Sequence, residues 1–430
     1  MTEKQRILAL SATAAGVQSL IALVTNSFRI FFGVYGPYCV TGMLAIFFDY
    51  ASRAVNGEVP YRDYLVEYPI AGFFLFLVPR MFVSDFAGYR VAFGVQLLLF
   101  NALAVYFVAR HVASTEGLEK VRPRLLWYSA FFASLCPLLM GPYDLAPMAV
   151  AFAAAHFWFS GRNVAGGMLA GVGFLMKIFP GAIAAPALIW EAARFRETRG
   201  RGMLSFLATV TAGMAFWFWL GGRHVADSFL YHTNRGLEVE SLYAGLLMLY
   251  GKASGQTVTW SYDHGALHIT PDWGSPFAKV SMPIQIAAIL FVVWQYRKSG
   301  MRDGVRYAGA SVLAFMAFGK VLSPQFLIWL IPFVTVLGGQ TGRLSRAIFL
   351  QACIITTLIY PLIVLRFILE ENALWSILVL NYRNALLIVL LYIILFGKET
   401  LDEFPVSKAS ESQPETPSPS PSPSPSPSRL

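Results

Sequence analysis

The chain has 430 residues, of which 56% are hydrophobic and only 13% are charged. Soluble globular chains are typically about one quarter charged, so this composition excludes an ordinary soluble protein and indicates a polytopic membrane protein. A net charge of +9 is also seen in nucleic-acid-binding proteins, but here the basic residues follow the pattern of a membrane-topology signal, and no nucleic-acid partner is expected.

Apolar runs recur along nearly the whole chain and predict an all-α bundle of about 10 to 13 transmembrane helices, with further helices in the external loops and no large soluble domain. The first run has no small-residue cleavage site after it, which indicates a retained span rather than a cleaved signal peptide. Several runs are shorter than the roughly 20 residues of a full crossing, so we expect them to be extended by flanking residues or broken and buried among neighbours. The predicted spans are Ile7–Val24, Val91–Ala109, Leu125–Met140, Leu145–Phe159, Val164–Met176, Gly181–Trp190, Met203–Leu220, Val280–Tyr296, Tyr307–Phe318, Phe326–Leu337, Ala347–Phe367 and Leu374–Phe396.

Charged residues divide between the two sides of this predicted bundle. Lys and Arg gather on one side, which the positive-inside rule assigns to the cytoplasm, and most acids lie on the other. The separation holds only if Ile70–Phe82 does not cross the membrane, so this segment is interpreted as re-entrant, as is Leu242–Tyr250. Both termini are therefore expected in the cytoplasm of a multi-pass cell-membrane protein. The basic residues are Lys4, Arg6, Arg110, Lys120, Arg122, Arg124, Arg194, Arg196, Arg199, Arg201, Arg297, Lys298, Arg302, Arg306, Arg343 and Arg346.

Residues 1–400 are predicted to form one membrane domain, whose longest external loops are residues 33–69 and 221–279. The tail at residues 405–430 ends in the repeat "PSPSPSPSPSPS". Alternating Pro and Ser can build neither a core nor a helix. The tail is therefore predicted to be disordered and cytoplasmic.

The first external loop contains the stretch "NGEVPYRDYLVEYP" at residues 56–69. The preceding "MLAIFFDYASRAVNG" predicts an amphipathic helix at the interface that ends at Gly57. Pro60 and Pro69 stiffen the stretch because they restrict the residues before them to extended conformations. One interpretation is an aromatic belt with solvated charges. The other is the wall of an active site, with an acid as general base and tyrosines stacked on a sugar; the residues concerned are Tyr61, Arg62, Asp63, Tyr64, Glu67 and Tyr68.

Three cations are predicted on the external side, namely Lys177, Arg235 and Lys320. A lysine deep in a membrane segment usually has an anionic partner or a functional role, with snorkelling to the headgroups as the alternative. The Arg fork and the Lys point charge both suit phosphate oxygens. If the three cations converge, they would bind a lipid phosphate opposite the acids of the first loop. Asp144 lies at the external mouth of a helical hairpin and is interpreted either as a loop cap or as a substrate contact.

The motifs that carry the chemistry occur in a fixed order. They are "G..PYRDY..EYP" at residues 57–69, "YDLAP" at 143–147, "AGVGFLMKIFPG" at 170–181, "RGLEVES" at 235–241, "SPQFLIWLIP" at 323–332 and "YRNALL" at 382–387. In this order they resemble the polyprenyl-phosphate-sugar-dependent membrane glycosyltransferases of the GT-C superfamily. The closest similarity is to bacterial glycosyltransferase family 87, which includes mannosyltransferases that use polyprenyl-phosphate mannose. The likeness runs from about residue 40 to residue 395.

The resemblance implies inverting transfer of a sugar, mannose in the first instance, from a polyprenyl-phosphate donor to a hydroxyl of a lipid or glycan acceptor on the extracytoplasmic side. Such enzymes usually carry an acid soon after the first span, at a place that here falls near Gly42 and Met43, so another acid takes the role of base. The residues expected in these roles are Asp63, then Asp49 and Glu67, as catalytic acids; Lys177, Arg235 and Lys320 at the donor phosphate; and Arg62, Tyr68, Asp144, His232 and Glu238 at other parts of the substrates.

No Gly-rich phosphate-binding motif or Rossmann-like pattern is present, which agrees with a lipid-linked rather than a nucleotide-linked donor. No cofactor is identified, and no ligand cluster supports a divalent metal. The alternatives are a multi-span transporter or lipid flippase, and an inactive protein of the same fold. A transporter would place its site near the bilayer midplane between repeated halves, whereas here the acids concentrate outside and no internal repeat is visible.

Overall fold

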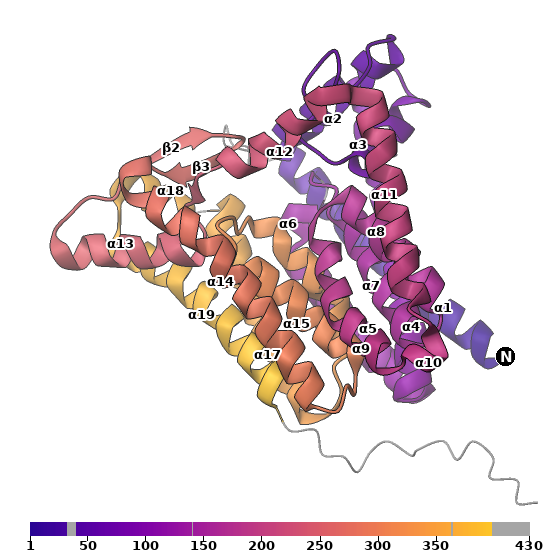
Figure 1. The fold of residues 1–430 in the computed structure, drawn as a ribbon. Coiled ribbons are helices and arrows are strands. Elements are labelled where there is room, and N and C mark those ends of the chain that lie inside the picture. The colour runs from indigo at the N-terminus through magenta and orange to yellow at the C-terminus, as the bar shows by residue number, and fades with distance from the viewer. Residues whose placement is uncertain (32–39, 140, 363, 398–430) are drawn as a thin grey trace, which may run out of the picture. The chain divides into compact units, whose positions relative to one another are not determined.

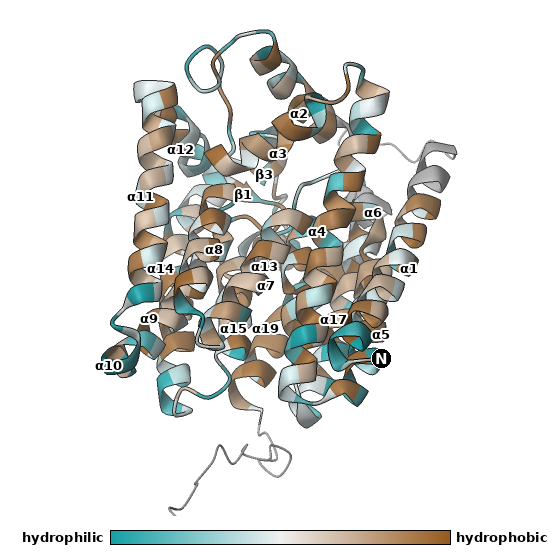
Figure 2. Ribbon diagram, turned by 90° about the vertical axis from the view of Figure 1, so that its right-hand side faces the viewer, coloured by the Kyte–Doolittle hydropathy of each residue, from teal (hydrophilic) through white to brown (hydrophobic). Residues whose placement is uncertain are grey.

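Long apolar helices dominate the structure, a computed structural model that describes residues 1–31, 40–139, 141–362 and 364–397. Their length and composition confirm the predicted all-α membrane architecture. Most of their residues are apolar or only weakly polar, as the brown and pale ribbons in Figure 2 show, which suits contact with lipid tails. Within the described residues, six helical segments are long and apolar enough to cross a membrane: Glu3–Thr25 of α1 (Glu3–Phe31), α4 (Phe86–Thr115), Arg201–Asn234 with α11 (Arg201–Gly221), α14 (Pro271–Lys298), Gly339–Tyr360 with α17 (Gly339–Thr357), and α19 (Leu374–Phe396).

Shorter apolar helices fill the interior, as the short predicted runs led us to expect. Almost every residue of α7 is buried, because a helix that is apolar all round must be covered on all sides. The 11 residues of α3 measure about 16 Å at 1.5 Å per residue, roughly half of a hydrocarbon core, so α3 is too short to cross alone. These segments are α3 (Ile70–Arg80), α7 (Leu145–Phe159), α8 (Asn163–Met176), η1 (Phe179–Ile183) with α9 (Ala184–Ala193), and η3 (Pro324–Leu330) with α16 (Ile331–Thr335).

Glycines allow α8 and α11 to pack closely. A Cβ added at Gly167 would lie 2.0 Å from the carbonyl oxygen of Gly202, and one at Gly171 would lie 2.8 Å from Cβ of Thr209. Gly167 and Gly171 are four residues apart and share one face of α8, the small-xxx-small arrangement that brings membrane helices together. This packing holds the end of α8, and with it Lys177, against the rest of the bundle.

One end of the bundle carries α2 (Val40–Val55), α12 (Val225–Asn234), α13 (Leu242–Ser254) and a small antiparallel sheet in the order β1-β3-β2 (Figure 1). The strands are β1 (Leu237–Glu238), β2 (Trp260–Asp263) and β3 (Ala266–Ile269). His264 and Gly265 both have positive φ, at 44° and 71°, and form the two-residue turn between β2 and β3. Such a turn matches the twist of paired strands. This sheet was not predicted from the sequence. The helix predicted to end at Gly57 is present as α2.

The opposite end carries the N-terminus, the start of α5 (Leu118–Ser134) and the short α10 (Phe195–Thr198) (Figure 1). Figure 2 shows that the turns at this end are strongly hydrophilic. The remaining helical elements are α6 (Cys136–Leu139), η2 (Gly222–His224), α15 (Gly304–Ala317), η4 (Leu358–Leu362) and α18 (Val364–Glu371).

Two predicted boundaries differ from those of the helices in the structure. The predicted span Ala347–Phe367 is interrupted at Tyr360, whose φ of −141° and ψ of 132° are not helical, because the residue before a proline avoids the helical region. The helix that contains the predicted span Val280–Tyr296 begins earlier, at Pro271, because a proline fits the first turn of α14, where its missing N–H is not needed. The predicted tail at residues 405–430, and residues 33–39 of the first loop, lie outside the described residues.

Candidate functional site

The loop at residues 56–69 is held in place by its own tyrosines. The Tyr61 hydroxyl donates to the carbonyl of Tyr68 at 2.8 Å, and the Tyr64 hydroxyl donates to the carbonyl of Tyr50 at 2.6 Å. Tyr61 and Tyr64 are buried, with 2% and 7% of their surface exposed. Both rings pack inward, so neither offers the free face that the expected stacking on a sugar requires.

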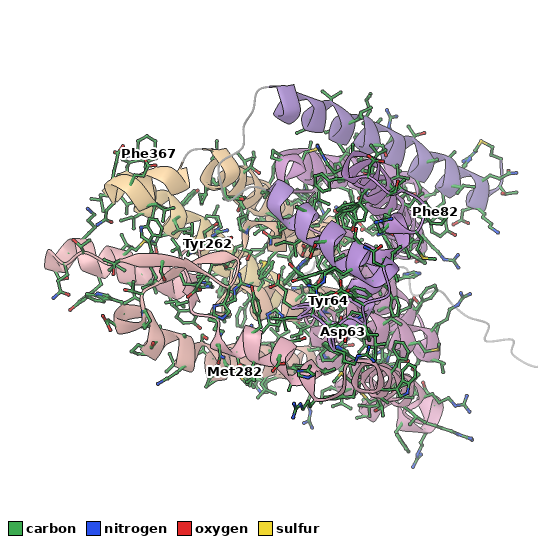
Figure 3. The ribbon with its side chains drawn as sticks, turned by 90° about the horizontal axis from the view of Figure 1, so that it is seen from above. Asp63, Tyr64, Phe82, Tyr262, Met282 and Phe367 are labelled. Atoms are coloured by element: carbon green, nitrogen blue, oxygen red, sulfur yellow. The ribbon has the colours of Figure 1, made fainter. Side chains whose placement is uncertain are left out.

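Asp63, the predicted base, does not line the cavity to which the end of this loop contributes. Its carboxylate accepts hydrogen bonds from Arg62 Nε at 2.9 Å and from the backbone N–H of Val59 at 2.7 Å. These two contacts, the Arg62 bond first, lower the pKa of Asp63. Seen from the sheet end, Asp63 lies beside Tyr64 (Figure 3). A well-solvated carboxylate that is already paired with arginine is a weak proton acceptor, so Asp63 is poorly placed for the role. Asp49 is exposed on α2 and also lies outside the lining of this cavity.

Glu67 is the acid of this loop that lines the cavity. Its carboxylate is hydrogen-bonded by the hydroxyl of Tyr68, and the hydroxyl of Tyr231 makes the same contact from α12. Burial, followed by the Glu67 charge, raises the pKa of Tyr68 well above its usual value, so this phenol stays protonated and remains a donor. The Nε2–H of His232 donates to the backbone carbonyl of Glu67 at 2.7 Å and ties the loop to α12.

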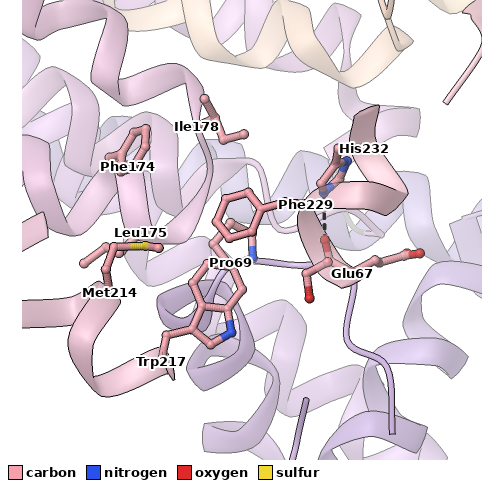
Figure 4. Close-up of a pocket in the computed structure, with 10 residues that line it drawn as sticks. Glu67, Pro69, Phe174, Leu175, Ile178, Met214, Trp217, Phe229 and His232 are labelled. Carbon is pink, nitrogen blue, oxygen red and sulfur yellow. Dashed lines mark hydrogen bonds between the residues drawn. The ribbon is translucent and has the colours of Figure 1, made fainter. Parts of the chain in front are cut away.

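The cavity is partly open, measures about 370 Å³ with the solvent at its mouth included, and lies among α8, α11, α12 and the end of the loop. Figure 4 shows Glu67 and His232 on one side of it and mostly apolar side chains on the others. The Nε1–H of Trp217 is buried and has no hydrogen-bond partner among the described residues. The lining consists of Glu67, Pro69, Phe174, Leu175, Ile178, Met214, Trp217, Ser228, Phe229 and His232.

Lys177 lies at the break after α8, where the chain turns to an extended conformation before η1. Its Nζ is 2.6 Å from Oδ1 of Asp144, which also accepts from the indole N–H of Trp329. The ammonium also lies over the rings of Tyr143, Phe326 and Trp329, at 4.9 to 5.3 Å from their centroids. The predicted anionic partner of Lys177 is therefore Asp144. Asp144 makes no side-chain cap bond, which excludes the loop-cap interpretation.

Arg235 and Lys320 form a second pair of cations at the sheet end. Lys320 Nζ donates to the backbone carbonyls of Thr233 at 2.9 Å and Arg235 at 2.6 Å. Burial, and then repulsion by Arg235, lowers the pKa of Lys320. The Arg235 guanidinium lies 3.6 Å from Glu238 and donates to Nε2 of His268 at 3.3 Å.

Glu238, predicted to bind substrate, serves as an internal anchor. Its carboxylate accepts from the backbone N–H of Leu322 at 2.6 Å and from the hydroxyl of Ser323 at 2.8 Å. It is buried, with 6% of its surface exposed. These bonds fix the loop that carries Lys320 next to the segment that carries Arg235.

His232 lies within electrostatic range of the three predicted cations. The charges of Arg235, Lys177 and Lys320 all act on its imidazole, although they come from three distant parts of the chain. The same histidine is bonded to the backbone of Glu67. The structure thus gathers three cations, a histidine and one acid that lines the cavity, while Asp63, Asp49 and the exposed Arg62 lie apart from them.

Sequence reasoning missed three contributors to this arrangement: Trp217, Tyr231 and His268. All are common residue types in membrane helices or hairpins, and only their partners in space distinguish them. Burial, followed by the charge of Arg235, lowers the pKa of His268 to about 4, so the ring is neutral and accepts the Arg235 hydrogen bond.

Within the described part of the chain, no group of three or more His, Cys, Asp or Glu side chains is placed to bind a metal ion. No family model and no curated protein sequence matches the chain.

Proposed function

We propose that the chain is an integral-membrane glycosyltransferase that moves a sugar, mannose in the first instance, from a polyprenyl-phosphate donor to an acceptor hydroxyl. The observation that carries the proposal is that the charges of Lys177, Arg235 and Lys320 all act on His232, whose Nε2–H donates to the backbone carbonyl of Glu67. Three cations suit a leaving phosphate, and an adjacent acid suits the removal of a proton from the acceptor. The ordered motifs of the sequence resemble those of enzymes with this chemistry.

In this proposal Glu67 is the general base. It takes the proton of the acceptor hydroxyl, the oxygen attacks the anomeric carbon, and the bond from that carbon to the phosphate oxygen breaks. The electron pair leaves with the polyprenyl phosphate, whose charge the three cations stabilise. Of the three candidate acids, Glu67 alone lines the cavity, and its backbone carbonyl accepts a hydrogen bond from His232.

The proposed site faces the extracytoplasmic side. The basic turns lie at the end of the bundle opposite α2, α12 and the sheet, and the positive-inside rule assigns such an end to the cytoplasm. Sugar transfer on that side can use a lipid-linked donor and does not require a nucleotide sugar.

The test is an assay of the purified protein with radiolabelled polyprenyl-phosphate mannose and a membrane lipid extract as acceptor. The proposal expects label in a product other than the donor lipid. Uptake of the label into proteoliposomes without formation of a new glycosylated product would support a transporter instead. Polyprenyl-phosphate glucose, assayed in parallel, reports the choice of sugar.

A further inference from the structure

The motif "YRNALL" at residues 382–387 has no role in the proposed chemistry, yet it places two polar side chains deep in a helix. Arg383 is nine residues beyond the start of α19, which is about 14 Å along a helix. Its surface is 0% exposed. An ionised residue in this setting is costly and is usually kept for a purpose.

Arg383 and Asn384 bind the segment that follows β1. Arg383 Nη2 donates to the carbonyl of Glu240 at 3.0 Å and lies 3.6 Å from its carboxylate. Asn384 Nδ2 donates to the carbonyls of Glu240 at 3.4 Å and Ser241 at 3.3 Å. The Ser241 hydroxyl in turn caps the first turn of α13. Two side chains of α19 therefore fix the point at which the segment 235–241 joins α13.

Fold stability alone does not account for this arrangement. Nε of Arg383, Oε2 of Glu240 and Oδ1 of Asn384 are buried without a hydrogen-bond partner in the described part of the chain. A buried ion pair with unsatisfied atoms is generally no more stabilising than apolar side chains of the same volume. The presence of the Arg383–Glu240 pair therefore indicates that it holds the segment 235–241 in a particular position.

The segment that Arg383 fixes is the one that carries the cations. Glu238 lies two residues before Glu240, and its carboxylate and N–H bind the loop of residues 320–323. Lys320 in that loop donates to the carbonyl of Arg235. Residues 235–241 and 320–323 are thus bonded into one unit, and α19 joins that unit to the bundle that holds Lys177.

We infer that Arg383, assisted by Asn384, is a positioning residue that sets Arg235 and Lys320 at their distance from Lys177 and so shapes the phosphate site. The identity of the ligand, a lipid phosphate, rests on the proposed function. The positioning of Arg235 and Lys320 by Arg383 does not, because it can be measured without ligand. Arg383 touches no substrate in this account and acts through Glu240.

The test compares Arg383→Lys with Arg346→Lys in the full-length protein in detergent. Arg346 is a matched control, because it is also buried and donates to a main-chain carbonyl, that of Leu337 at 2.6 Å, but belongs to α17. Hydrogen exchange of the peptide covering residues 235–245 is measured without ligand. We expect about tenfold faster exchange in Arg383→Lys and unchanged exchange in Arg346→Lys, because local opening becomes easier only where the anchor is lost. Unchanged exchange in Arg383→Lys overturns the inference.

Binding of farnesyl phosphate gives the second readout. Arg383→Lys and Arg235→Ala should each weaken binding about tenfold, while the double variant should bind no more weakly than Arg235→Ala alone, because the anchor acts through that arginine. Fully additive losses would overturn the inference. If the unmodified protein binds no farnesyl phosphate, the proposed function fails and the exchange result alone decides on positioning. If Arg383→Lys does not fold, Asn384→Ala is read by the same exchange criterion.

Discussion

Nζ of Lys177 lies 2.6 Å from Oδ1 of Asp144, and the carboxylate of Asp144 is completely buried. The two residues flank a helical hairpin in the sequence, since Asp144 precedes α7 and Lys177 follows α8. The pair closes the open end of that hairpin. It also leaves the ammonium partly exposed, with 20% of the lysine side chain accessible.

The Lys177–Asp144 pair predicts that removing the cation alone lowers stability more than removing both charges. Lys177→Met leaves the Asp144 charge buried without its cation, which typically costs about 3 to 5 kcal/mol. Adding Asp144→Asn should recover most of the loss, since the amide carries no charge and its oxygen still accepts from Trp329. Unfolding temperature in detergent measures both variants. A double variant less stable than Lys177→Met would contradict the pairing.

Gly72 lies so close to the same hairpin that a larger side chain is not expected to fit there. A Cβ at this position would lie 2.9 Å from the carbonyl oxygen of Met176, which already accepts a hydrogen bond from the Tyr143 hydroxyl at 3.1 Å. Gly72→Ala should therefore lower stability by about 1 to 3 kcal/mol, because a backbone atom cannot easily move aside. Gly16→Ala in α1 is the control, with no atom within 4 Å of the added Cβ, and should be neutral or slightly stabilising. Equal unfolding temperatures for the two variants would refute the contact.

Glu240 predicts a loss of stability as pH rises. Burial, only partly offset by Arg383, raises the pKa of this carboxyl to about 8 from a usual value near 4.5, in a segment between β1 and α13 that lies outside the membrane spans. An acid whose folded pKa is raised favours the folded state below its unfolded pKa and loses that contribution as pH rises toward the folded pKa. The unfolding temperature should thus fall between about pH 5 and pH 8, and Glu240→Gln should flatten this dependence. A slope that is the same in both proteins would assign the effect to other groups.

Much of the bundle could be predicted from the sequence, because long apolar runs such as α4, α11 and α14 can be stable only in lipid or in a core. The short runs at α7 and α8 were predicted as candidate broken helices for the same reason, since they fall below a full crossing. The sheet was missed because strands of two to four residues leave almost no periodic signal, and its turn depends on positive φ at His264 as well as at Gly265.

The site was only partly predictable. One-sided charge placed Lys177, Arg235 and Lys320 on a common side, and the structure brings all three into electrostatic range of His232. Asp63 was ranked above Glu67 from the sequence, although both are acids of one short loop and the sequence does not show which of them faces the cavity. Their difference arises from the backbone between them, which turns Asp63 toward Arg62 and brings Glu67 to α12.

The proposed orientation predicts labelling from opposite sides of the membrane. In a background without native cysteines, Arg196→Cys in α10 should react with a membrane-impermeant maleimide only from the cytoplasm, and Asn56→Cys after α2 only from outside. Both positions are exposed at opposite ends of the bundle. The positive-inside rule supplies the direction. Labelling of Arg196→Cys in intact cells would reverse the topology and move the proposed site to the cytoplasm.

The assignment of the base predicts a sharp difference between two acids of one loop. Glu67→Gln keeps the shape of the side chain and can still accept the hydrogen bonds of Tyr68 and Tyr231, but it cannot accept a proton. Since a positioned base typically contributes on the order of 100- to 10,000-fold, turnover should fall by that range while farnesyl phosphate binding stays within about twofold.

Asp63→Asn is the matched control for this variant. Asp63 is more exposed and is engaged by Arg62 and the backbone of Val59, so its loss should reduce turnover less than tenfold through loop stability alone. A large loss of turnover in Asp63→Asn, with Glu67→Gln near normal, would return the role of base to Asp63. Near-normal turnover in both, and in Asp49→Asn as well, would mean that no acid of this loop takes the proton, and that its charges and tyrosines serve only to anchor it at the membrane interface.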